Sequence, residues 1–209
     1  MSMEPQERIV NKAHELFMRY GIRSVSMDDV ATHLGISKKT IYQFYADKDA
    51  LVEGVIDIEI KANQCECTLH KQKSENAIQE LFMAVDMMLD VLSKINPTVL
   101  FDLEKYHTKA FRKHNEFMNK FLYSIIKENL DWGKSEGLYR EEVKTDILAR
   151  FRLASTFLIL NPELFLVGKH SLPNVFAEIT DNFLYGLASA KGLKLIQKYK
   201  QQRQKNIPL

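Results

Sequence analysis

Apolar residues recur along most of this chain at intervals of three and four positions, the spacing that gathers them on one face of an α-helix. The first such face lies in residues 5–20 and is followed by Gly21, where the helix should end. Its apolar members are Ile9, Ala13, Leu16 and Phe17. No stretch alternates apolar and polar residues long enough to form a sheet. We therefore predict an all-α protein, with further helices over 27–34, 38–45, 48 into the sixties, 75–95, 99–107, 109–134, 144–160 and 173–190.

Residues 24–51 contain the signals of two short helices joined by a tight turn, with a third helix behind them. Ser26 is a candidate N-cap, and Asp29 stands three residues later in the capping-box position. Gly35 can adopt the left-handed conformation that closes a helix, and Ser37 can cap the next one. This arrangement is typical of a helix-turn-helix, which places its second helix in the major groove of DNA.

The second short helix carries side chains suited to DNA. Ile41 and Phe44 are three residues apart and are expected to pack inward against the preceding helix. Lysines near a helix start suit phosphate, and Gln43 can donate and accept at once, as adenine recognition requires. The surface that remains consists of Lys38, Lys39, Thr40, Tyr42, Gln43 and Tyr45. The alternative is a three-helix packing module whose polar face is merely solvated.

The run ERIVNKAHELFMRYGIRSVSMDDVATHLGISKKTIYQFYADKDAL strongly resembles the DNA-binding region of TetR-type transcriptional regulators. A second run, WGKSEGLYR at 132–140, looks like the family's turn between its two long C-terminal helices. One departure is Tyr45, a second tyrosine beside Phe44 where the family often has none. The matching positions are Ile9, Ala13, Leu16, Phe17, Gly21, Ser26, Val30, Ala31, Gly35, Ser37, Thr40, Tyr42, Phe44, Lys48 and Leu51.

The resemblance implies a helix-turn-helix DNA-binding domain over residues 1–50 and a helical effector-binding and dimerisation domain over 51–209. It implies a homodimeric repressor that leaves a palindromic double-stranded DNA operator when a small molecule enters the C-terminal domain. An alternative shares every N-terminal feature, namely a DNA-binding dimer with no small-molecule effector, whose C-terminal core is filled rather than hollow.

Two roles follow from the resemblance for the DNA-binding residues. Thr40, Tyr42 and Lys48 are the expected phosphate contacts, whereas Gln43 and Lys39 are the expected base readers. Ser26 and Thr40 suit a capping or turn role equally well. The expected DNA-binding set is Ser26, Lys38, Lys39, Thr40, Tyr42, Gln43 and Lys48.

Two late helices, over 144–160 and 173–190, carry wide apolar stripes. In proteins that resemble this one, the last two long helices pair with their copies as a four-helix bundle, so we expect the dimer here. The alternative is that both stripes face the subunit's own core. An effector pocket in such a protein is apolar with a few polar handles, which suits a lipophilic compound. The residues expected to line it, each of which can instead be ordinary core, are Phe101, Tyr106, His107, Phe121, Trp132, Phe157 and Asn161.

The composition of the chain and the motifs it lacks restrict the functions that we expect. The formal net charge of +2 is too small to indicate nucleic-acid binding by itself, so the basic footprint must be local. The basic tail KGLKLIQKYKQQRQKN can bind nucleic acid, but a pattern of this kind is more typical of a solvated helix end. No phosphate loop, G-x-S-x-G or H-E-x-x-H motif is present, so we expect no enzyme, no catalytic residues and no cofactor. With no apolar run that could cross a bilayer and no leader segment recognised, we expect a cytoplasmic protein.

Cys65, Cys67 and His70 form the pattern C-x-C-x-x-H, which suggests either a metal or thiol sensor or plain reduced thiols. Cysteines two positions apart on a helix diverge, so a disulfide between them is geometrically poor. Cys67 and His70 can share a face, but a metal site needs further ligands. We therefore expect structural thiols and no metal.

Overall fold

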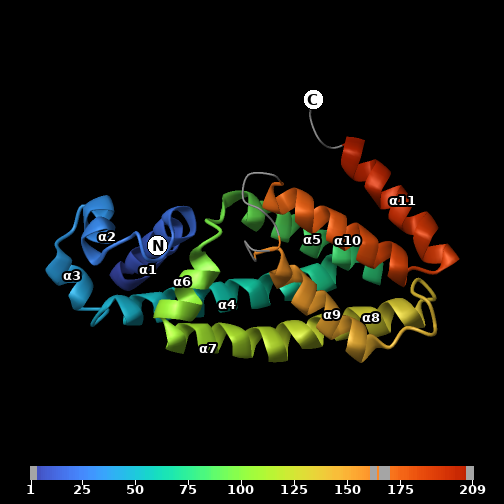
Figure 1. Cartoon of the computed structure of the whole chain (residues 1–209), viewed down its shortest axis with the longest axis horizontal. Helices are drawn as coiled ribbons and strands as arrows, with labels where there is room; N and C mark the ends of the chain where they lie inside the picture. The colour runs from blue at the N-terminus through green and yellow to red at the C-terminus, as the bar shows by residue number, and fades with distance from the viewer. Residues whose placement is uncertain (1–3, 161–163, 165–169, 206–209) are drawn as a thin grey trace. The chain divides into compact units, whose positions relative to one another are not determined.

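The computed structural model describes residues 4–160, 164 and 170–205, and the helices in these ranges confirm the all-α prediction. No strand occurs in the part of the chain that is described. The first helices are α1 (Pro5–Tyr20), α2 (Met27–Leu34), α3 (Lys38–Tyr42), α4 (Lys48–Lys73), α5 (Ala77–Lys94) and α6 (Val99–Tyr106). They are followed by α7 (Thr108–Phe117), a π-helical turn η1 (Met118–Leu122), α8 (Tyr123–Ser135), α9 (Thr145–Leu158), α10 (Leu172–Leu187) and α11 (Ala190–Lys205). Figure 1 labels the α-helices. None of the described helices has the length and apolar character needed to cross a membrane.

The expected helix over 109–134 is interrupted rather than regular. Its first part is α7, its last part is α8, and the π-helical turn Met118–Leu122 joins them. The expected helix over 173–190 is also shorter, because α10 ends at Leu187 and Ala188 leaves the helical conformation as its C-cap. The basic tail then forms α11, a helix of its own.

The chain divides into two compact units, and the division differs from a boundary at residue 50. One unit comprises Met1–Cys65 and Lys94–Phe117, and the other comprises Glu66–Ser93 and Met118–Leu209. The first unit therefore combines α1, α2, α3 and most of α4 with α6 and α7. Long-range contacts hold these pieces together, which is why the pattern along the sequence does not reveal their grouping.

The first unit has one apolar core shared by its six helices. Asn96 and Asp102 add polar contacts between distant parts of the chain. The Asn96 backbone N–H donates to the Met18 carbonyl at 2.6 Å, and the Arg23 N–H donates to Asp102 Oδ2 at 2.9 Å. The fully buried residues of this apolar core include Ile9, Ala13, Phe17, Val30, Ile41, Leu51 and Val52.

The second unit is built around Tyr139, which follows the turn after α8. Its ring lies where a Cβ at position 133 would come within 2.1 Å, so only glycine fits there. The Tyr139 hydroxyl donates to Asn129 Oδ1 at 3.1 Å, and Asn129 Nδ2 donates to Glu80 Oε2 at 2.7 Å. This buried network satisfies polar groups inside an apolar core, as burial requires. The core also contains Ala77, Ile78, Leu130, Leu184, Leu187 and Ile196.

Candidate functional site

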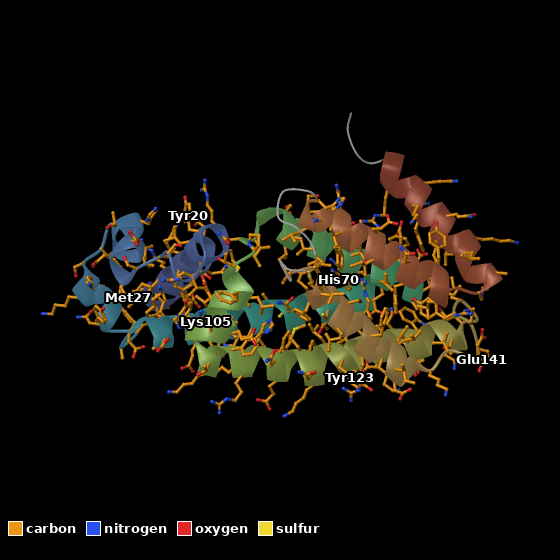
Figure 2. The ribbon with its side chains drawn as sticks, viewed as in Figure 1. Tyr20, Met27, His70, Lys105, Tyr123 and Glu141 are labelled. Carbon is orange, nitrogen blue, oxygen red and sulfur yellow. The ribbon has the colours of Figure 1, made fainter. Side chains whose placement is uncertain are left out.

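Both ends of α2 have the geometry that the sequence predicted. Ser26 Oγ accepts the Asp29 N–H at 3.1 Å, and the Ser26 N–H donates to Asp29 Oδ2 at 2.8 Å, which completes the capping box. Gly35 closes α2 with φ +65°, in the left-handed region that favours glycine. Met27, at the first position of α2, is buried in the same module (Figure 2). The Ser26 side chain therefore has a capping role in the fold.

α3 is held in a fixed orientation. Ser37 Oγ accepts the Thr40 N–H at 3.1 Å, and the two hydroxyl oxygens of Ser37 and Thr40 lie 2.8 Å apart. Ile41 is fully buried in the core of the first unit. Because one side of this five-residue helix is anchored, the opposite side presents a defined set of side chains to solvent. The exposed members of that set are Lys38, Lys39, Tyr42, Gln43 and Phe44.

The expected packing of Phe44 and Tyr45 was wrong. Phe44 is 40% exposed, whereas Tyr45 is only 7% exposed. α3 ends at Tyr42, and the Phe44 N–H bonds three residues back, to the Ile41 carbonyl, so regular helical spacing does not reach position 44. Tyr45 turns inward against Gly54 of α4, where a Cβ would lie 2.8 Å from the ring. Burial raises the pKa of the Tyr45 hydroxyl.

The two lysines flanking this face have partners within the protein. Lys38 Nζ pairs with Asp28 Oδ2 at 2.9 Å, and this contact raises the pKa of the lysine. Lys48 Nζ lies 3.5 Å from the Arg23 carbonyl and 5.9 Å from the centre of the Phe17 ring. Burial lowers the pKa of Lys48, although nearby carboxylates oppose the shift. Lys39 carries no such contact in the described structure and is exposed.

Comparison with known proteins fits this geometry. Residues 9–55 match the family model described as bacterial regulatory proteins, tetR family. Residues 9–55 are therefore similar to the DNA-binding region of the tetR family, and the comparisons together support a TetR-type transcriptional regulator. The chain is 26% identical over 184 residues to the uncharacterized HTH-type transcriptional regulator YvaF of Bacillus subtilis, covering 88% of this chain and 95% of that protein.

Solved structures support the same fold. A TetR-family regulator from Agrobacterium tumefaciens superposes with a TM-score of 0.74 at 14% identity, covering 88% of this chain and 97% of that one. FadR from Bacillus subtilis, solved in complex with stearoyl-CoA, gives a TM-score of 0.66 at 13% identity, covering 84% of this chain and 96% of that one. At such identities the likeness establishes the architecture of a helix-turn-helix domain followed by a helical domain.

The residues expected to line an effector pocket fall into different units. Phe101, Tyr106 and His107 belong to the first unit. Phe101 is exposed, and Lys105 lies over the rings of both Phe101 and Tyr106 (Figure 2). His107 Nδ1 pairs with Asp49. Tyr106 and His107 line a half-open cavity of about 240 Å³ together with Asp47, Asp49, Ala50, Glu53, Thr108, Lys109 and Ala110.

The other expected pocket residues lie in the second unit, except for Asn161, which lies outside the described residues. Phe121 is half-buried in the π-helical turn, and Phe157 is half-buried near the end of α9. The Trp132 ring is covered by Lys71, whose Nζ lies 3.7 Å from the ring centre. Trp132 thus already has a cation on one face.

The cysteine pattern sits on α4. Cys65 is exposed and Cys67 is buried, and both are free thiols. Burial raises the pKa of the Cys67 thiol, which keeps it protonated and unreactive. His70 Nε2 lies 3.6 Å from Glu66 Oε2, on the same helix (Figure 2). Within the described ranges no three His, Cys, Asp or Glu side chains are grouped as metal ligands would be.

Proposed function

We propose that this TetR-type regulator is a homodimeric repressor that binds a palindromic operator through α3 and is released from it by a small molecule bound in the second unit. The observation that carries the proposal is the face of α3. Ile41 anchors one side of the helix in the core, and the opposite side presents lysine, tyrosine, glutamine and phenylalanine side chains to solvent. Such a set combines phosphate contacts with base readers.

The proposed DNA contacts divide by chemistry. Gln43 and Lys39 read base edges in the major groove, since both are exposed and polar. Tyr42 and Thr40 hydrogen-bond phosphate oxygens. Phe44, which the sequence pattern assigned to the core, is exposed beside them and offers apolar contact to a thymine methyl group.

Lys38 and Lys48 supply charge for the DNA backbone in this proposal. Each first has to leave a contact within the protein, Lys38 with Asp28 and Lys48 with the Arg23 carbonyl. Both contacts are partly exposed, and such pairs are weak in water. A phosphate can therefore replace either partner at small cost.

The proposed dimer uses α9 and α10. Ile147, Phe151 and Leu158 are large exposed side chains of α9, spaced four and seven residues apart, so they form one stripe. Phe151 is 56% exposed, and its ring stacks on Phe183 of α10 at 6.3 Å between centroids. Exposed apolar stripes of this kind indicate an interface, and a second copy of the same helices can bury them.

A small-molecule effector in the second unit completes the proposal. FadR from Bacillus subtilis has the same fold and was solved with stearoyl-CoA bound. A lipophilic ligand suits an apolar helical domain, because such pockets are lined mainly by apolar side chains. Ligand that binds only the folded protein raises its melting temperature, so a panel of hydrophobic compounds tests this part of the proposal.

The DNA-binding part is tested by selection. The purified protein is incubated with fragmented genomic DNA at low salt, and the recovered fragments are sequenced. Recovery of one palindromic site is expected, together with its loss in Tyr42→Ala. Tyr20→Ala, which removes another exposed tyrosine of the first unit (Figure 2), should keep the site. Failure to recover any site with folded wild-type dimer would refute the proposal.

A further inference from the structure

Arg152 of α9 is buried inside the second unit. It is 8% exposed, and its Nη1 donates to Thr180 Oγ1 of α10 at 3.0 Å. Its Cζ lies 5.1 Å from the centre of the Phe176 ring and 5.4 Å from that of Phe183. Thr180, Phe176 and Phe183 are themselves buried, so the guanidinium reaches the inner face of α10.

The charge of Arg152 has no counter-ion in the part of the chain that is described. The hydrogen bond to Thr180 is neutral, and no Asp or Glu of the described ranges forms an ion pair with this guanidinium. Burial lowers the pKa of Arg152 to about 10, and no nearby carboxylate offsets the shift. Two aromatic rings recover part of the cost of burying a cation, but an unpaired buried charge is otherwise strongly unfavourable.

The guanidinium also has unused donors. An arginine carries five N–H groups, and Thr180 takes one of them. The hydrogen bond to Thr180 uses Nη1, so Nε and Nη2 have no hydrogen-bond partner among the described residues. An anionic group beside the guanidinium would meet a planar pair of donors, and Thr180 and the two phenyl rings hold that guanidinium in place.

We propose that Arg152 anchors an anionic group of the effector, either a carboxylate or a phosphate. This inference rests on the proposed function, in which the second unit binds a small molecule. The planar fork of arginine matches both anions with two parallel hydrogen bonds, and the bond is stronger where water is excluded. The apolar side chains around the site take the rest of the molecule, so the effector class is a lipophilic anion.

The first test needs no ligand. Arg152→Met keeps an unbranched apolar stem, although a shorter one, and removes the uncompensated charge, so ligand-free protein should melt at least about 2 °C higher than wild type. Arg150→Met is the matched control, because Arg150 is exposed on the same helix and stacks on Tyr123, with Cζ 4.6 Å from the ring centre (Figure 2). A fall in the melting temperature of Arg152→Met, larger than that of the control, would show a structural role and overturn the proposal.

The second test compares matched compounds. Straight-chain, aromatic and polycyclic carboxylic acids are each paired with their methyl esters, and melting temperature and operator release are measured. At least one acid should stabilise and release the wild-type protein while its ester does not, and Arg152→Met should lose at least about 10-fold in affinity for that acid. Arg150→Met should retain it. Equal effects of acid and ester, or full affinity in Arg152→Met, would overturn the anchor.

The two tests separate this inference from the proposed function. If a neutral compound releases the operator and Arg152→Met responds like wild type, the effector function stands and the anionic anchor falls. If no compound of any charge releases the operator, the effector function falls. The ligand-free melting comparison still decides whether Arg152 is a structural residue.

Discussion

Replacing Gly54 by alanine tests how the end of α3 is held in place. Gly54 lies inside α4, and a Cβ there would come 2.8 Å from Tyr45 Cε1 and 3.3 Å from its hydroxyl oxygen. Tyr45 is almost fully buried, so its ring has little room to move away. Because Tyr45 lies three residues after the end of α3, a shift of its ring should also displace the exposed face of α3.

The expected magnitude combines two opposing effects. Alanine is better than glycine inside a helix by about 1 kcal/mol. Inserting a methyl group into a packed core costs about 1–3 kcal/mol. Gly54→Ala should therefore lower the free energy of unfolding by about 0–2 kcal/mol, and operator affinity should fall with it.

The sign of the effect should invert when the ring is removed. In a Tyr45→Leu background the three Tyr45 atoms nearest the new Cβ are removed, so Gly54→Ala should then stabilise the protein by about 1 kcal/mol. Denaturant unfolding of wild type, both single variants and the double variant gives the coupling energy, expected at about 1–3 kcal/mol. Additive effects, or a stabilised Gly54→Ala in the wild-type background, would refute the packing argument.

Four further outcomes are expected. Lys48→Ala should weaken operator binding for all sequences and reduce the slope of log K against log[salt] by about 0.9, one phosphate contact, in a salt titration. Gln43→Ala should relax sequence preference in a binding selection while leaving that slope unchanged. Phe151→Glu should weaken the dimer by at least about 2 kcal/mol in sedimentation equilibrium, whereas Lys194→Glu, at an exposed position of α11, should not. Burial lowers the pKa of His114 below 6.5, so the unfolded state takes up more protons as the pH falls. Stability should therefore decline below pH 6.5, and His114→Gln should flatten that decline in urea titrations across pH.

Local signals carried most of the element prediction. The capping box at Ser26 and the left-handed Gly35 lie within ten residues of each other, and the structure contains both as expected. Such motifs satisfy backbone groups with atoms only a few positions away, so sequence spacing is enough to recognise them. The same holds for the apolar face of α1, which is buried as predicted.

The packing of Phe44 and Tyr45 shows where spacing failed. Both residues come after the buried apolar residue of α3, and helical spacing alone favoured Phe44 as the next buried side chain. Which of the two side chains is buried depends on Gly54 of the next helix, because the missing Cβ there leaves room for the Tyr45 ring. That room is a property of two packed helices and is not visible in either helix alone.

The sequence by itself indicated most of the helices, the caps of α2 and α3 and the resemblance to TetR-type regulators, because these depend on short-range spacing and on a dense local motif. Only the tertiary structure decided which distant segments share a core. Residues 94–117 join the DNA-binding helices through contacts such as that of Arg23 with Asp102, 79 positions apart. The tertiary structure likewise places Arg152 against the inner face of α10, where it has no counter-ion among the described residues. Burial and charge compensation are sums over neighbours in space, and those neighbours are fixed only when the chain has folded.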